Sequence, residues 1–212
     1  MLPQIAILDP SLTLNLPKGI TAGTGMDALA HCIEAYSSPF YHPMAEGTAV
    51  EGLRLVKENI QEVYHNGSNV EARAHMLVAS MMGAAAFQKG LGAIHSITHP
   101  VNSLYHTHHG TTNGTVMPFV LNFNRQVIEK KFDRLANFLN ISNGFEGIVN
   151  WIIDLKKEMK IPETLKDMGV NSGDEVKLAP LAQEDPSTGG NPLEMDEGMF
   201  EKLIKNCIEG NY

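Results

Sequence analysis

The sequence predicts a mostly α-helical fold, a helical bundle with one short strand near its N-terminus. From residue 24 onward, apolar side chains recur at intervals of three and four residues, the spacing that places them on one face of a helix. Strand signals are almost absent, and the one convincing run is QIAILDP, residues 4–10, which Asp9-Pro10 cuts off. With 212 residues, of which 43% are hydrophobic, the chain can bury a substantial core.

Three helices are predicted in the first half of the chain, after a turn-rich entry. Residues 24–37 form the first helix, with Thr24 as its N-cap and two prolines beyond its end. Residues 44–65 carry an apolar stripe at helical spacing, and residues 70–88 form a helix rich in Ala, Ser and Gly. A strand at residues 4–10 would need a neighbour for its backbone groups, and no other strand is predicted here.

The second half is also helical. Residues 93–124 are predicted to form two helices joined by the histidine-rich stretch 106–110, and Pro100 and Pro118 should kink or start helices there. The remaining predicted helices follow at residues 130–140, 145–159, 172–184 and 196–209.

Composition narrows the class of function. A formal net charge of −8 without a Lys/Arg cluster disfavours nucleic acid and anionic membranes as partners. The N-terminus lacks the features of a signal peptide, and no run approaches the roughly 18 apolar residues of a membrane span. Two distant cysteines, Cys32 and Cys207, are typical of free thiols in a reducing compartment, so we expect a cytoplasmic protein.

The segment GMDALAHCIEAY, residues 25–36, places Asp27 and His31 four positions apart in an apolar run. On a helix, both side chains then point towards a common spot. This pair could be a salt bridge, a cap or half of a metal site. A single Asp-x-x-x-His is more often a helix salt bridge, so the spacing alone leaves these alternatives open.

Five of the nine histidines fall within fifteen residues, and this clustering favours a metal site: His95, His99, His106, His108 and His109. Neutral imidazole is a common metal ligand, and an Asp oxygen beside His nitrogens suits Fe²⁺ or Zn²⁺. Glu34, three residues beyond His31, could support a ligand from outside the ligand set. No P-loop, G-x-G-x-x-G or G-x-S-x-G motif is present.

Four segments, LDPSLTLNLP, TAGTGMDALAHCIEAYSSP, AFQKGLGAIHSITHPVNSLYHTHHG and NGTVMPFVLNFN, resemble in order and spacing the iron-dependent (group III) alcohol dehydrogenases. The resemblance implies the C-terminal helical domain of the dehydroquinate synthase-like fold. It also implies four metal ligands, namely Asp27, His31, His95 and His109. By the same resemblance, His99 of H-x-x-x-H-P lies near the nicotinamide and relays a proton, while His106 and His108 flank the cleft.

The family's chemistry implies cofactors and substrates as well. The metal is usually Fe²⁺ and sometimes Zn²⁺, the hydride acceptor is NAD or NADP, and the substrate is a small primary alcohol or its aldehyde. In the family, the stretch that LTLNLP resembles touches the cofactor, which implies Thr13 and Leu16 as contacts. Members commonly form homo-oligomers, and the apolar face of a halved cleft would favour self-association.

Members of this family have two domains, and the resemblance covers only the second. Residues 1–20 are therefore expected to be a remnant strand and linker of a nucleotide-binding domain, and 21–212 the helical metal-binding domain. Without the family's phosphate-binding turn, we expect little activity from the chain alone. A non-catalytic helical metal-binding module is the alternative. A metal-dependent hydrolase is disfavoured, because no further carboxylate is placed for a second metal or as a general base.

The sequence also departs from the family pattern near the site. Asn102 stands where a glycine is expected, and Thr111 and Thr112 stand where apolar residues are usual. These differences bear on the shape of the substrate pocket and on helix packing, whereas all four implied ligands are present.

Overall fold

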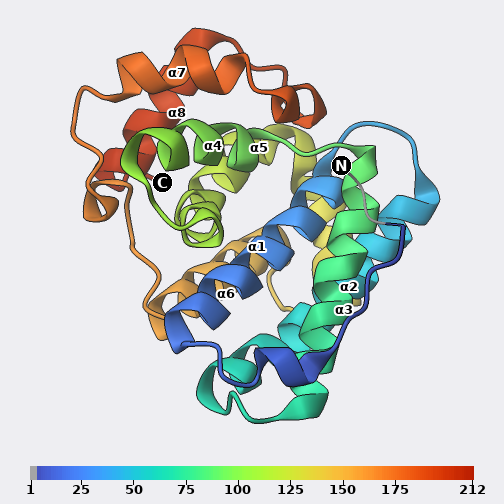
Figure 1. The fold of residues 1–212 in the computed structure, drawn as a ribbon. Helices are drawn as coiled ribbons and strands as arrows, with labels where there is room; N and C mark the ends of the chain where they lie inside the picture. The colour runs from blue at the N-terminus through green and yellow to red at the C-terminus, as the bar shows by residue number, and fades with distance from the viewer. Residues whose placement is uncertain (1–3) are drawn as a thin grey trace.

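A computed structural model of the chain describes residues 4–212, and within them the regular structure is helical (Figure 1). Four short 3-10 helices accompany the α-helices. The α-helices are α1 (Lys18–Ser37), α2 (Pro43–His65), α3 (Val70–Ala86), α4 (Ala93–Tyr105), α5 (His109–Phe138), α6 (Gly144–Glu158), α7 (Glu175–Gln183) and α8 (Glu197–Glu209). The predicted mostly α fold is confirmed.

Helix α1 runs through the middle of the molecule (Figure 1). It packs against α2 and α3 on one side and against α5 on another. Helix α5 in turn contacts α6 and α4, and α4 contacts α7, which pairs with α8. Because α1 contacts α5, and α5 contacts α4, side chains of α1 can meet residues from both of these helices.

The first helix begins six residues earlier than its predicted start at residue 24. Lys18 is its first residue, and Thr24 lies inside it, where its hydroxyl donates to the carbonyl of Ile20 at 2.9 Å. Thr24 is therefore not an N-cap. Ala22 is buried one turn before Met26, so the apolar face, and with it the helix, extends further towards the N-terminus.

The predicted strand at residues 4–10 is wrong for the described chain. Residues 4–9 are irregular and exposed, with Ile5 81% and Ile7 86% accessible. Asp9 then caps the 3-10 helix Pro10–Thr13 by accepting from the amide of Ser11. A strand requires adjacent backbone, and residues 4–212 offer only helices and loops. Residues 1–3 of the predicted segment 1–20 lie outside the described residues.

The prolines in the middle of the chain lie inside helices and start none. Pro100 lies within α4 and Pro118 within α5, and α5 continues to Phe138, so the separate helix predicted at 130–140 belongs to α5. Each proline removes one backbone donor. The buried neighbours Met117 and Phe119 favour continuation, because packing of a long apolar face outweighs one missing hydrogen bond. The predicted connection at the histidine-rich stretch is confirmed.

Cys32 and Cys207 are both free and buried, and burial raises the pKa of the Cys32 thiol to about 12. Within the described residues, no single helix is long and apolar enough to cross a membrane. One bent pair, Val70–Lys89 with Ala93–Tyr105 at 107°, meets the criterion only when taken together.

Candidate metal centre

Helix α1 contributes the first two side chains of a polar cluster. Asp27 and His31 lie one turn apart, with Asp27 Oδ2 3.8 Å from His31 Nδ1, and their side chains are 26% and 18% exposed. The neighbouring positions Met26, Ala28 and Ala30 are buried, so the apolar pattern of the helix fixes the direction of this polar pair.

Helix α4 adds His95, which is buried. Its Nε2 lies 3.8 Å from Asp27 Oδ1, and its ring stacks on that of His31 with centroids 4.7 Å apart. Its Nδ1 lies 2.5 Å from Glu34 Oε2, so this carboxylate contacts the ring on the side opposite to Asp27. One ligand atom from each of Asp27, His31 and His95 lies within 4.8 Å of the other two. A single metal ion can bind three atoms at this spacing.

His109, the first residue of α5, borders the same cluster on its exposed side. Its Nε2 lies 3.3 Å from Asp27 Oδ1, and its ring centroid is 5.3 Å from that of His95. Its side chain is 40% exposed, compared with 2% for His95. The four residues that the family resemblance implied as ligands are thus brought together from three helices.

Asn113 is a member of the cluster that sequence reasoning missed. It is fully buried, and its Nδ2 donates to Asp27 Oδ1 at 2.7 Å while lying 3.2 Å from Nε2 of both His95 and His109. It follows His109 by four residues on α5, the same spacing that drew attention to Asp27 and His31. This spacing is the sequence signal that could have identified Asn113 as a member of the cluster.

Neighbouring charges shift the pKa values in the cluster. Burial disfavours the imidazolium of His95, but the carboxylates of Glu34 and Asp27 outweigh burial and raise its pKa to about 9. Burial also opposes ionisation of Asp27, yet the adjacent imidazoles of His109, His95 and His31 hold its pKa well below the usual range. The pKa of His31 is lowered, mainly by burial. The cluster therefore holds an ionised Asp27 and attracts positive charge.

The donor set fits a divalent cation. His31 Nδ1 and Asn113 Oδ1 are buried, and neither has a hydrogen-bond partner among the described residues. Buried polar atoms without partners are costly, so their presence on two residues of the cluster fits a site built to hold a positive group. Imidazole nitrogens with one carboxylate suit a borderline ion such as Fe²⁺ or Zn²⁺.

His99 stands beside the cluster rather than in it. Its Nδ1 lies 2.8 Å from Asp185 Oδ2, and Asp185 also accepts from the amide of Ser187. The His99 ring is stacked on that of His109 with centroids 5.6 Å apart. Asp185, from the loop before Pro186–Gly190, is a second contact that the sequence did not predict.

The other two clustered histidines serve the chain turn between α4 and α5. His106 adopts a left-handed conformation with φ 54° after α4, and His108 caps α5 by accepting from the amide of Thr111. Both are exposed. Neither forms a hydrogen bond or an ion pair with Asp27.

A comparison with protein families identifies the family of the chain. The model of the Fe-containing alcohol dehydrogenase family, C-terminal, matches residues 21–208. The chain belongs to this family.

Relatives of known activity agree with that assignment. The 4-hydroxybutyrate dehydrogenase of Cupriavidus necator is 38% identical over 98% of this chain and 56% of its own length. The NAD-dependent methanol dehydrogenase of Bacillus methanolicus is 35% identical over 97% of this chain and 56% of its own length. A crystal structure of 1,3-propanediol oxidoreductase superposes with a TM-score of 0.93 at 32% identity, covering 98% of this chain and 56% of the other. The chain thus spans about half the length of these Fe-containing alcohol dehydrogenases.

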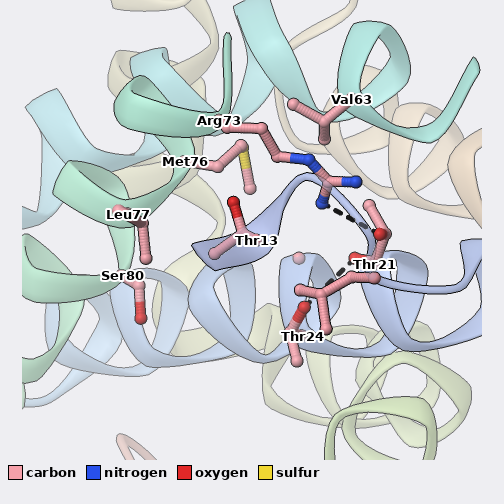
Figure 2. A pocket seen from close by; sticks show the side chains of 10 residues that line it. Thr13, Thr21, Thr24, Val63, Arg73, Met76, Leu77 and Ser80 are labelled. Atoms are coloured by element: carbon pink, nitrogen blue, oxygen red, sulfur yellow. Dashed lines mark hydrogen bonds between the residues drawn. The ribbon is translucent and has the colours of Figure 1, made fainter. Parts of the chain in front are cut away.

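Thr13 and Leu16, the two residues that the resemblance placed against the cofactor, lie together on a pocket of about 250 Å³. Figure 2 shows this pocket between the N-terminal part of α1 and helix α3, with Thr13, Thr24 and Ser80 around it. Arg73 reaches in from α3, and its guanidinium donates to Thr21 Oγ1 at 2.9 Å. Thr24 lies on this pocket one turn before Asp27, so the pocket and the polar cluster follow one another along α1.

Proposed function

We propose that this chain carries the metal-binding half of an NAD(P)-dependent alcohol dehydrogenase that interconverts a small primary alcohol and its aldehyde. The observation that supports this most is the convergence of Asp27, His31, His95 and His109 in a chain of the Fe-containing family. Relatives named for 4-hydroxybutyrate, methanol and 1,3-propanediol share a primary alcohol, which supports that substrate class.

In this proposal Asp27, His31, His95 and His109 hold one divalent metal, Fe²⁺ or Zn²⁺. Such a metal supplies Lewis acidity that polarises the alcohol oxygen and favours loss of its proton. Asp27 offsets one of the two metal charges, and the neutral histidines leave the remaining positive charge to act on substrate. Glu34 keeps Nδ1 of His95 engaged, so that Nε2 faces the metal position.

His99 is the proposed proton relay. Asp185 accepts from His99 Nδ1, which leaves the other ring nitrogen to take up a proton released on the substrate side. At 43% side-chain exposure His99 can pass that proton to solvent. The hydride acceptor would be NAD or NADP, with Thr13 and Leu16 among its contacts.

Division of labour within the chain follows the same proposal. Residues 21–212 would form the helical metal-binding domain, and residues 1–20 would connect it to a nucleotide-binding domain. The chain covers only 56% of the length of relatives such as the 4-hydroxybutyrate dehydrogenase, which is consistent with a second domain. We expect the chain alone to oxidise alcohols poorly, because helix N-termini and glycine-rich turns that bind pyrophosphate contribute much of cofactor affinity.

Metal stoichiometry tests the ligand set. The chain is loaded with Fe²⁺ under anaerobic conditions, freed of excess metal, and analysed for elemental iron as wild type, Asp27→Ala and His95→Ala. His65→Ala is the matched control, because His65 is exposed at the end of α2 and contacts Glu158 instead. We expect one equivalent in the wild type and in the control and none in the two site variants. Iron retained by both site variants would refute the proposed ligands.

Alcohol binding tests the reaction class on the same chain. With Co²⁺ in place of iron, the visible absorption of the metal reports its coordination. Adding 1,3-propanediol is expected to perturb that absorption in the wild type. Propane at the same dissolved concentration, which lacks hydroxyl groups, is expected to leave it unchanged. A spectrum insensitive to primary alcohols at saturating concentration would argue against an alcohol substrate and favour a metal-binding module without catalysis.

A further inference from the structure

His109 is the proposed ligand with the least support from packing. It is the first residue of α5, directly after the turn 106–108, and its side chain is 40% exposed. An exposed imidazole can rotate and can carry its proton on either ring nitrogen. The structure therefore must supply a contact that orients it if it is to bind metal tightly.

Asn102 supplies that contact from the last turn of α4. Its Oδ1 lies 2.9 Å from His109 Nδ1. Its Nδ2 donates to two hydroxyl oxygens, Thr107 Oγ1 at 2.7 Å and Thr112 Oγ1 at 3.0 Å. Both amide hydrogens are thus used on the side away from His109, and the amide oxygen faces the ring.

The two threonines fix the amide in this orientation. Thr112 is fully buried and its hydroxyl donates to the carbonyl of His108 at 3.1 Å, so its oxygen remains to accept. Thr107 Oγ1 lies 2.9 Å from Thr112 Oγ1, which places a second donor on that oxygen. In this arrangement every donor of the three side chains has an acceptor.

The orientation of the Asn102 amide determines the tautomer of His109. An oxygen can only accept, so His109 Nδ1 must carry the proton and Nε2 must carry the lone pair. The opposite side of the ring agrees, because Asn113 Nδ2, a donor, lies 3.2 Å from His109 Nε2. Nε2 is also the atom that faces Asp27 Oδ1 at 3.3 Å. This is the tautomer that can ligate a metal at the cluster.

We propose that Asn102, held by Thr107 and Thr112, is a positioning residue that fixes His109 with its Nε2 lone pair directed at the metal site. The inference rests on the proposed function for its consequence, metal affinity. Asn102 and Thr112 are two of the positions at which this chain departs from the family pattern. Because Asn102 and Thr112 are hydrogen-bonded to each other, the two departures act together on the orientation of His109.

The first test is the tautomer of His109 in the metal-free chain, read from ¹⁵N chemical shifts of its ring nitrogens at about pH 8. We expect the proton on Nδ1 in the wild type and a mixture of tautomers in Asn102→Ala. This measurement requires no metal, so it stands even if the proposed function fails. A wild-type ring protonated on Nε2, or a tautomer unaffected in Asn102→Ala, would overturn the inference.

Affinity for Zn²⁺, measured by competition with a chelator, is the second test. We expect Asn102→Ala to bind one equivalent about 10- to 100-fold more weakly, as is typical when an outer partner of a ligand is removed. Asn102→Asp keeps an accepting oxygen and should retain most of the affinity, and Ser103→Ala, at the exposed next position, should match the wild type. Equal affinity in Asn102→Ala and wild type would overturn the inference, whereas no stoichiometric zinc in the wild type would refute the proposed function instead.

Thr112→Val provides an independent variant that keeps the shape of a buried side chain. It removes one acceptor of the Asn102 amide and is expected to weaken Zn²⁺ binding less than Asn102→Ala. Circular dichroism of each variant verifies the helical fold. If Asn102→Ala does not fold, wild-type affinity and an unchanged His109 tautomer in Thr112→Val would overturn the inference.

Discussion

Glu34 and His95 form a buried carboxylate–imidazole pair, with Glu34 Oε2 2.5 Å from His95 Nδ1. The other oxygen of Glu34 accepts from the amide of Ile94 at 2.7 Å, in the first turn of α4. A carboxylate is favoured at a helix N-terminus, where amides lack partners and the helix dipole is positive. Glu34 therefore fixes the start of α4 and the orientation of the His95 ring together.

We predict that Glu34→Gln lowers affinity for Zn²⁺ or Fe²⁺ by about 10- to 100-fold. Ile94 and His95 face different oxygens of Glu34, and in a glutamine one of these two positions becomes an NH₂ group, which donates. Either the amide of Ile94 loses its partner or His95 takes up the tautomer that points a proton at the metal. Isothermal titration measures the affinity, and Glu201→Gln, exposed on α8, is the matched control. Affinity equal to that of the control would show that Glu34 does not orient His95.

His99 provides a test that separates proton relay from metal binding. We predict that His99→Gln retains one equivalent of metal with affinity within about threefold of the wild type. The reason is that His99 in the wild type contacts Asp185 through Nδ1 and lies outside the proposed ligand set. His109→Gln, whose side chain borders Asp27, should bind metal at least about tenfold more weakly. Elemental analysis and titration of the two variants side by side measure this difference. A similar loss in both variants would make His99 a ligand.

The sequence predicted the helices well where apolar spacing was uninterrupted. Helices α2 and α6 lie within one residue of their predicted ranges, because their buried faces repeat at helical spacing and polar turns follow. The start of α1 was missed because Thr24 resembles an N-cap, while the small residues before it gave a weak apolar signal. Only packing against neighbouring helices shows that this segment is buried.

The candidate site was only partly accessible from the sequence. Spacing identified Asp27 with His31, and motif resemblance added His95 and His109, yet their convergence depends on how α1, α4 and α5 pack. Asp185 could not be assigned, because a carboxylate in isolation is typical of many solvated positions. Asn113 carried one local signal, its spacing of four residues from His109. The contacts of Asn113 with Asp27 and of Asp185 with His99 each span 86 residues, a distance over which local patterns carry no information.

Gly110 sets the approach of α5 to α1. A Cβ atom at this position would lie 2.0 Å from the carbonyl oxygen of Gly23 and 2.9 Å from Asp27 Cβ. We predict that Gly110→Ala lowers the free energy of unfolding by about 3 kcal/mol, because backbone atoms must move to relieve the contact. Metal affinity should fall with it, since Asp27 and His109 lie on the two helices that are forced apart.

Gly19→Ala is the matched control for that substitution. Gly19 also lies in a helix, α1, but a Cβ there would meet nothing within 4 Å. Its free energy of unfolding should change by less than about 1 kcal/mol, in the stabilising direction, because alanine restricts the unfolded chain. Urea unfolding of the metal-free proteins measures both. Equal stabilities for the two variants would show that the helices tolerate a wider separation.

Lys156 makes the free energy of unfolding of the chain depend on pH in the alkaline range. Its buried Nζ donates to the backbone carbonyls of Thr115 and Glu163 at 2.9 and 3.2 Å, and burial lowers its pKa to about 8. The unfolded chain keeps an ordinary lysine pKa of about 10.4. Between these values the unfolded state binds more protons than the folded state, so this group makes the free energy of unfolding rise with pH.

We therefore predict that the wild type gains stability relative to Lys156→Met as pH rises from 7 to 10. At pH 7 both states carry the charge and the cost of burying it is fully present. By pH 10 the folded side chain is neutral, and the difference between the two proteins should have moved by about 2 kcal/mol in favour of the wild type. Urea unfolding of the metal-free proteins across this range measures it. Lys157→Met, at the exposed neighbouring position, should track the wild type at every pH, and a Lys156→Met curve parallel to both would mean that Lys156 titrates as an exposed lysine does.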